Sequence, residues 1–225
     1  MAILNPVILG GRAARGRDAP TPIGGVLKRS FDIAGAVCLI LLFSPLLLIV
    51  AGIMRLGDPG PVFFSHRRVG FGGVPFGCLK FRTMVTNSSE ALADLLARDP
   101  EAAREWRETQ KLRSDPRITR LGRFLRETSL DELPQLFNVL RGEMSLVGPR
   151  PIVAAEVERY GDDIAAYEAG RPGITGLWQV SGRSNCSYAD RVGYDVEYVG
   201  RWSLLRDIEI LVRTVRVVLA REGSR

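Results

Sequence analysis

One long uncharged stretch dominates the pattern of hydrophobic and polar positions along this chain. From Ile33 to Met54, 22 consecutive residues carry no charged side chain. A straight helix of that length would extend about 33 Å, close to the thickness of a bilayer core. The stretch starts too late for a secretory signal peptide, and no small-residue cleavage site follows it. It therefore predicts a segment embedded in a membrane.

Two features of this stretch bear on its topology. Ser44-Pro45 stands in its middle, and proline breaks or kinks a helix because it has no backbone donor. Basic residues flank both ends, Lys28 and Arg29 before it and Arg55 after it, and basic flanks favour the cytoplasmic side. A re-entrant helix–break–helix that enters and leaves on one side satisfies both features. A kinked single span is the alternative.

The rest of the pattern predicts an α+β chain that is mainly helical and has a small β element. Short strands are expected at 62–64 and 75–81, and helices at 87–110, where Pro100 interrupts, and at 128–144. Residues 204–219 place apolar side chains at helical spacing with arginines among them. Such a helix lies on a membrane surface or packs its apolar face against the core.

Length and charge narrow the classes of function. The chain has 225 residues, enough for one domain with a real core. A net charge of +6 is concentrated in residues 1–30 and 111–126. With the single histidine His66 and three widely spaced cysteines, a His-rich metal site and a disulfide framework are excluded. We expect no nucleic-acid partner, because only the high pI suggests one and no recognition motif is present.

A pair of adjacent carboxylates, Asp131 and Glu132, follows the second basic segment. In one interpretation Ser129 and Glu132 form a capping box that starts a helix. In the other, the carboxylates do chemistry, because a carboxylate can attack phosphorus and a pair can hold Mg²⁺. An apolar stripe from Leu133 to Leu140 follows them, so the segment suits a phosphorylated lipid and a charged co-substrate.

Several cations stand in settings that suit phosphate or nucleotide binding. Arg150 lies between two prolines, which restrict its backbone and preset its guanidinium as a fork for phosphate. Lys80 stands at the end of an expected strand. In the glycine-rich segment 171–183, Trp178 is a candidate for contact with a base or sugar and Arg183 for contact with an anion. A solvated surface turn and a tryptophan in the core are the plain alternatives.

In this order, the motifs resemble those of the bacterial sugar transferase family, the monotopic polyprenol-phosphate phosphoglycosyl transferases. The resemblance covers nearly 200 residues and rests on Lys28–Asp32, Ser44-Pro45, Lys80–Met84, Ser129–Leu136, Gly148–Pro151 and Arg171–Gly176. It implies a re-entrant membrane helix at Ser44-Pro45. The family pattern often has glutamine where this chain has His66, so we assign that residue no catalytic role.

The resemblance also implies a reaction. Asp131 would attack the sugar-bearing phosphate of a UDP-sugar and release UMP, with Glu132 completing the dyad and both carboxylates holding Mg²⁺. The phosphosugar would then pass to undecaprenyl phosphate, the first membrane step of exopolysaccharide or a related glycan. UDP-galactose or UDP-glucose is the expected donor. Lys80, Arg126, Arg150 and Arg183 are the expected phosphate- and nucleotide-binding residues.

The implied organisation is a flexible basic leader over residues 1–27, a re-entrant membrane hairpin over 28–56, and a catalytic domain over 57–225. The catalytic domain is expected on the cytoplasmic face of a bacterial inner membrane, in contact with membrane lipids. We expect the catalytic core alone, without the large N-terminal membrane domain of some relatives. The alternative is a non-catalytic scaffold whose basic patches hold anionic lipids and which tolerates changes at Asp131 and Glu132.

Overall fold

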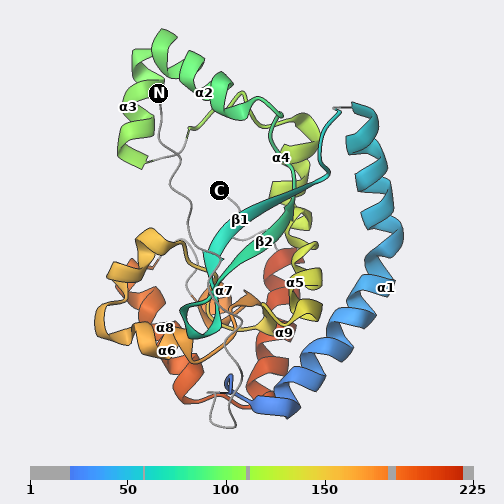
Figure 1. The fold of residues 1–225 in the computed structure, drawn as a ribbon, viewed down its shortest axis with the longest axis vertical. Coiled ribbons are helices and arrows are strands. Elements are labelled where there is room, and N and C mark those ends of the chain that lie inside the picture. Colours follow the sequence, from blue (N-terminus) through green and yellow to red (C-terminus); the bar gives the residue numbers. More distant parts are fainter. Residues whose placement is uncertain (1–20, 58, 110–111, 182–185, 220–225) are drawn as a thin grey trace, which may run out of the picture.

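A computed structural model describes residues 21–219 except 58, 110–111 and 182–185, so most of the predicted leader lies outside the described residues. The fold is mainly helical with a small β component (Figure 1), as predicted. Its α-helices are α1 (Gly25–Gly57), α2 (Ser88–Arg98), α3 (Pro100–Thr109), α4 (Arg120–Glu127), α5 (Gln135–Arg141), α6 (Ile164–Glu168), α7 (Leu177–Ser181), α8 (Tyr188–Gly200) and α9 (Leu204–Leu219). Short 3₁₀ turns occupy η1 (Phe71–Gly73), η2 (Leu130–Glu132), η3 (Ala154–Arg159) and η4 (Gly161–Asp163).

The strands form two small sheets. β1 (Phe63–Val69) and β2 (Pro75–Phe81) make an antiparallel hairpin in which Phe64 faces Lys80 and His66 faces Cys78. β1 is longer than the predicted 62–64. β3 (Ser145–Val147) and β4 (Gly173–Thr175) pair in parallel. Parallel strands need a crossover connection between them. The pairing of β3 with β4 therefore brings together two segments that are far apart in the sequence.

The apolar stretch forms one continuous helix, α1, with Pro45 inside it. The predicted division into two separate helices is therefore not what the structure has, although Figure 1 shows that the helix axis bends. The hydroxyl of Ser44, beside the proline, donates a hydrogen bond to the carbonyl of Leu41 at 2.9 Å. Among the described residues, α1 is the one helix long and apolar enough to cross a membrane.

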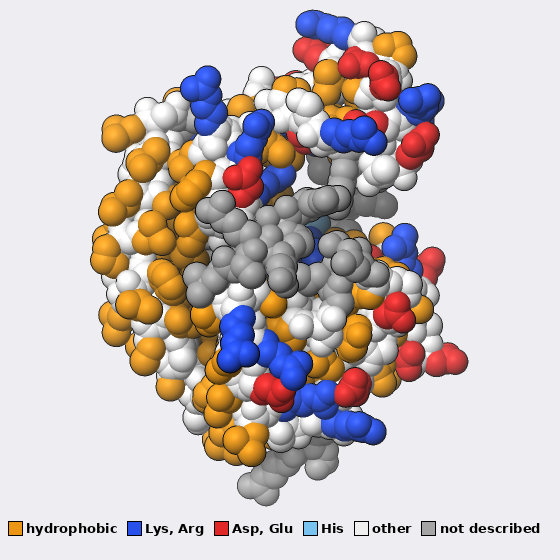
Figure 2. Space-filling view, turned by 180° about the vertical axis from the view of Figure 1, so that it is seen from behind, with side chains coloured by type: hydrophobic (Ala, Val, Ile, Leu, Met, Phe, Trp, Pro, Cys, Tyr) orange, Lys and Arg blue, Asp and Glu red, His pale blue; other side chains and the backbone are white. Residues whose placement is uncertain are grey.

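The outward face of α1 is apolar. Only 11% of its most apolar window is buried, and Leu41, Leu42 and Leu48 are between 67% and 73% exposed. Figure 2 shows hydrophobic side chains along the edge of the molecule that α1 forms. Single exposed leucines are common on soluble proteins, but a contiguous patch of this kind marks a contact surface. The helix is thus compatible with membrane association.

Both ends of α1 pack against the same protein body. Near its N-terminus, Lys28 is 3% exposed and its Nζ lies 2.6 Å from Oδ2 of Asp207 on α9. In its C-terminal half, Val50 and Met54 are buried against a cluster that includes Leu125 of α4. The two attachments place α1 along the body as a strap.

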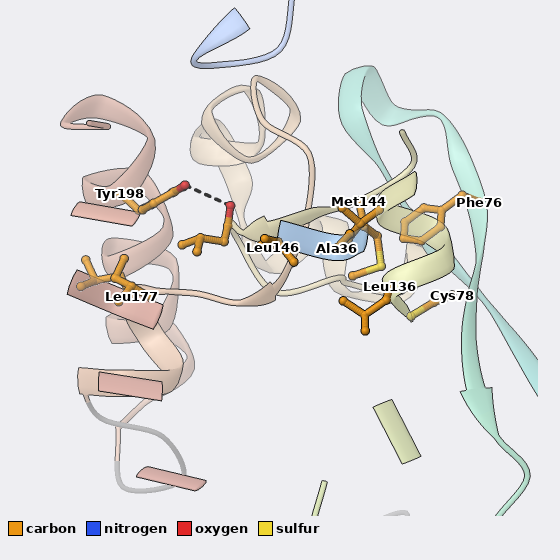
Figure 3. Close-up of a cluster of buried hydrophobic side chains, with 11 residues drawn as sticks. Ala36, Phe76, Cys78, Leu136, Met144, Leu146, Leu177 and Tyr198 are labelled. Atoms are coloured by element: carbon orange, nitrogen blue, oxygen red, sulfur yellow. Dashed lines mark hydrogen bonds between the residues drawn. The ribbon is translucent and has the colours of Figure 1, made fainter. Parts of the chain in front are cut away.

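The main core lies between α1, the two sheets and the C-terminal helices (Figure 3). Figure 3 shows that its side chains come from elements far apart in sequence, including Ala36 of α1, Leu136 of α5 and Tyr198 of α8. The Tyr198 hydroxyl donates to Oδ1 of Asp207 at 2.7 Å and also lies 3.0 Å from the carbonyl oxygen of Val147. This satisfied buried network joins α8 and α9 to the end of β3.

Prolines explain how two predicted helices are divided. Pro100 opens α3, a position where its missing N–H costs nothing, so 87–110 is two helices as the interruption predicted. The single helix predicted for 128–144 is wrong. It is divided at Pro134 into η2 and α5, and α5 ends at Gly142 in the left-handed conformation.

The sequence pattern of the C-terminal helix α9 left open whether its apolar face packs against the core or lies on a surface. The structure has both features. Asp207 and Ile210 are buried in the body, whereas Leu205, Val212 and Val215 are between 51% and 79% exposed. The helix therefore packs one side against the core and leaves a second apolar side uncovered.

Candidate active site

The paired carboxylates lie in the tight turn η2, between α4 and α5. Ser129, just before the turn, has φ 57°, the one positive φ outside glycine among the described residues. Its side chain makes no capping hydrogen bond, so the alternative interpretation of this segment as a capping box is wrong. Backbone strain of this kind costs about 1–3 kcal/mol and persists mainly at functional sites. The turn places the Asp131 side chain toward the interior, with the residue only 8% exposed.

Lys80 meets both carboxylates from the end of β2. Its Nζ lies 2.6 Å from Oε1 of Glu132 and 3.9 Å from Oδ2 of Asp131. Burial raises the pKa of Asp131 to about 6, the Glu132 charge adds to that effect, and Lys80 and Arg126 oppose it. The sequence placed these groups more than 50 residues apart, and the structure brings them within one site.

Arg126 approaches the same turn from α4. Its Nε donates to Oγ1 of Thr83 at 2.8 Å, which holds the guanidinium in place. Gly122 allows α4 to lie this close, because a Cβ there would come within 2.0 Å of the Thr83 carbonyl oxygen. The hydroxyl of Thr119 caps the helix by accepting from the Gly122 N–H at 2.8 Å.

Arg150 adds a further cation to the site. It follows β3, and its guanidinium lies 5.1 Å from the centre of the Trp178 ring. Its charge is attracted by Glu132 and repelled by Arg191 and Arg68. The predicted residues Lys80, Arg126 and Arg150 are therefore all brought to the carboxylates, whereas Arg183 lies outside the described residues.

Sequence reasoning missed two cations of this site. Directly opposed residues of an antiparallel pair share a face, so Phe64, His66 and Arg68 lie on the same face of the hairpin as Lys80. The alternation of β1 could have found Arg68, had its full length been predicted. Arg191 comes from α8, and no local signal in the sequence connects it to the carboxylates.

The donor set suits a small hard cation. Asp131 and Glu132 converge on the ammonium group of Lys80, so both present oxygen atoms to one region. Among the described residues no group of three or more His, Cys, Asp or Glu side chains forms a metal cage. Mg²⁺ needs no such cage, since it binds through one or two carboxylates together with substrate phosphates and water. The two carboxylates could therefore hold it.

Comparison with known proteins gives a consistent picture. The family model described as bacterial sugar transferase matches residues 23–221. The exopolysaccharide production protein ExoY of Rhizobium meliloti is 50% identical over 92% of this chain and 91% of its own length. The undecaprenyl-phosphate galactose phosphotransferase of Salmonella typhimurium is 54% identical over 88% of this chain but only 41% of its own length.

A third relative differs in the sugar that its name carries. The UDP-glucose:undecaprenyl-phosphate glucose-1-phosphate transferase of Caulobacter vibrioides is 43% identical over 88% of this chain and 71% of its own length. The matched region in all three relatives includes both the apolar helix and the segment with the paired carboxylates, since it spans about nine-tenths of this chain.

Proposed function

Because this chain belongs to the bacterial sugar transferase family, we propose that it transfers a hexose 1-phosphate from a UDP-hexose to undecaprenyl phosphate. The observation that carries the proposal is the buried carboxylate of Asp131 beside Glu132, with Lys80, Arg126 and Arg150 around them. Cations around a carboxylate nucleophile are what phosphoryl transfer requires, because negative charge spreads over the phosphate oxygens in the transition state. Named relatives use galactose or glucose, so UDP-galactose and UDP-glucose are the proposed donors.

The proposed chemistry has two steps. A carboxylate oxygen of Asp131 forms a bond to the sugar-bearing phosphorus, the bond from that phosphorus to the bridging oxygen breaks, and UMP leaves with the oxygen. A phosphate oxygen of undecaprenyl phosphate then attacks the same phosphorus, and the bond to Asp131 breaks. The product is an undecaprenyl-diphospho-hexose, the membrane-bound start of an exopolysaccharide or related glycan. Such covalent catalysis divides one difficult displacement into two easier ones.

The residues around Asp131 have distinct parts in this scheme. Lys80 stabilises the ionised form of Asp131, opposing the effect of burial, and so keeps it able to attack near neutral pH. Arg126, fixed by Thr83, and Arg150 are positioned to pair with phosphate oxygens. Mg²⁺ bound by Asp131 and Glu132 would neutralise the charge of the diphosphate.

The packing of α1 supports a monotopic arrangement, which we propose for the cytoplasmic face of the inner membrane. A helix that crossed the bilayer would carry one end about 30 Å away from a domain on one side. In α1 both Lys28 and Met54 are buried against the same body, and Leu41, Leu42 and Leu48 between them lie on the exposed face. On this proposal α1 enters one leaflet with that face, and the exposed apolar side of α9 rests on the same lipid surface.

This arrangement places the turn that carries Asp131 near the proposed membrane surface. Leu130, the neighbour of Asp131, packs against the cluster that contains Val50 and Met54 of α1. The catalytic turn therefore packs against the same apolar cluster as the membrane helix. Such a position suits a lipid phosphate, which stays at the level of the headgroups while its chain remains in the bilayer.

The test uses the full chain in detergent or nanodiscs with UDP-galactose and UDP-glucose. We expect UMP release, a hexose-phosphate adduct on the intact protein by mass spectrometry, and loss of both in Asp131→Asn. The exposed acid Asp94 on α2 supplies the control Asp94→Asn, which should behave as wild type. EDTA should abolish release and added Mg²⁺ should restore it. Substantial UMP release by Asp131→Asn would refute the assignment of the nucleophile.

A further inference from the structure

Arg191 of α8 carries an unused pair of hydrogen-bond donors. Its side chain is 9% exposed, and its Nε and Nη2 are buried without a hydrogen-bond partner among the described residues. The remaining nitrogen, Nη1, is 3.4 Å from Oε1 of Glu156. A buried donor left unpaired costs about 1–3 kcal/mol, so such an arrangement calls for an explanation.

The unused donors lie on the edge of the guanidinium that binds oxyanions in a bidentate manner. Arg117 shows the same edge in use within this chain. Its Nε and Nη2 donate to the two carboxylate oxygens of Asp115 at 2.8 and 2.7 Å. In Arg191 the equivalent fork has no such acceptor. A phosphate presents two oxygens with the same spacing as a carboxylate.

The acid that shares α8 with Arg191 does not fill the fork. Asp195 interacts electrostatically with Arg191, but its Oδ2 accepts from the hydroxyl of Tyr160 at 2.8 Å. Its Oδ1 is likewise without a hydrogen-bond partner among the described residues, so no hydrogen bond joins the two side chains.

The location of Arg191 connects it to the carboxylates. Its guanidinium lies 5.3 Å from the centre of the Trp178 ring and that of Arg150 lies 5.1 Å from the same centre. The charges of the two arginines repel each other, while Glu132 attracts Arg150. Arg150 therefore interacts electrostatically with both Glu132 and Arg191. An anion bound by both guanidinium groups would relieve their repulsion.

We propose that Arg191 binds the phosphate of the nucleoside monophosphate half of the donor, the half that leaves. The inference rests on the proposed function. A diphosphate whose sugar-bearing phosphorus lies at Asp131 extends its second phosphate past Arg150, toward the fork of Arg191 beside Trp178. Protein atoms cover the fork, so binding of the nucleotide includes a shift of the side chains over it.

The proposal predicts different effects of an Arg191 substitution on the two half-reactions. Only the first, release of UMP, involves the leaving phosphate; discharge of the phosphohexose from Asp131 to the lipid phosphate does not. For Arg191→Met we expect the KM for UDP-hexose and the inhibition constant of UMP to rise about 10- to 100-fold, the loss of a charge-assisted pair. Discharge of preloaded protein to undecaprenyl phosphate should stay unchanged. Arg191→Lys, which keeps the charge but lacks the fork, should fall between.

Arg159 supplies the matched control, because it is exposed and lies 4.9 Å from the Tyr188 ring centre, a ring that Arg191 also contacts. Arg159→Met should leave both half-reactions unchanged. Inhibition by uridine, which lacks phosphate, should be equal in wild type and Arg191→Met. Equal weakening of uridine and UMP, or equal slowing of both half-reactions, would overturn the proposal.

Calorimetric titration of UMP tests the role of Arg191 separately from the proposed transfer reaction. If wild type binds UMP and Arg191→Met does not, the phosphate site holds even where transfer to undecaprenyl phosphate fails. If wild type transfers phosphohexose and both proteins bind UMP equally, the proposed function holds and the role of Arg191 is refuted.

Discussion

The buried ion pair between Lys28 and Asp207 should fix the start of the membrane helix to the catalytic body. Their side chains are 3% and 0% exposed, and the charged atoms lie 2.6 Å apart. Lys28→Met would leave the carboxylate of Asp207 buried without its cation. Removing one partner of a buried pair costs about 3–5 kcal/mol.

The contacts of Asp207 place the expected cost at the lower end of that range. Its oxygens still accept from the Tyr198 hydroxyl at 2.7 Å and from Nε1 of Trp202 at 3.1 Å. A loss of about 3 kcal/mol lowers the Tm of a chain of this size by about 6–12 °C. Thermal unfolding of the purified protein in detergent, followed by tryptophan fluorescence, measures this shift.

Two further variants test whether the loss of stability comes from burial of the unpaired charge. Lys28→Met/Asp207→Asn removes both charges of the pair and should recover part of the lost Tm, because Asp207 no longer leaves a buried ion. The recovery should be incomplete, since Asp32, 4.0 Å from Nζ of Lys28, also loses its cation. Arg213, on the same helix as Asp207, pairs with Glu209 at 2.5 Å, but the two side chains are 50% and 56% exposed. Arg213→Met should cost under about 1 kcal/mol. A Tm of Lys28→Met within 1–2 °C of wild type, or no recovery in the double variant, would refute the reasoning.

Three other predictions concern residues that hold the site. Thr83→Val removes the hydroxyl that accepts from Nε of Arg126 and should lower kcat/KM for UMP release about tenfold, whereas Thr83→Ser should not; equal rates would contradict it. Asn138→Leu leaves the carbonyl of Gly77 and the N–H of Leu79 without side-chain partners and should cost about 2–4 kcal/mol by thermal unfolding. Burial raises the pKa of Asp195 to about 6, so its ionisation opposes folding at neutral pH. Its protonation should add stability as the pH falls from about 6 toward 4. Asp195→Asn should therefore gain less than wild type when Tm is compared at neutral and mildly acidic pH, with the remaining gain due to groups such as Asp131, whose pKa is also raised to about 6.

Much of the candidate site could be predicted because its residues lie in local sequence contexts with a physical meaning. The paired carboxylates after a basic segment and the arginine between prolines suited phosphate chemistry before any contact was known. The capping-box interpretation failed for a local reason that the sequence does not show. Ser129 adopts a left-handed conformation, which non-glycine residues rarely do, and in it the side chain makes no capping hydrogen bond.

Contacts between distant segments were harder to predict. Arg191 reaches Trp178 and Arg68 reaches Arg150 only because a helix and a hairpin pack around the same turn. Periodicity reports which face of an element is apolar, but it does not report which other element covers that face. No sequence feature marked Arg191, since its burial depends on residues more than 30 positions away, such as Glu156.

The sequence by itself determined the apolar helix, the mainly helical class, the order of the family's motifs and the residue types available for catalysis. These follow from composition and short-range spacing, which act within one element. The tertiary structure decided that α1 remains one bent helix through Pro45 and that both of its ends rest on one body. It also brought Lys80 within 2.6 Å of Glu132. Such decisions depend on the packing of side chains from separate elements, whose combined burial outweighs the preference of any one residue.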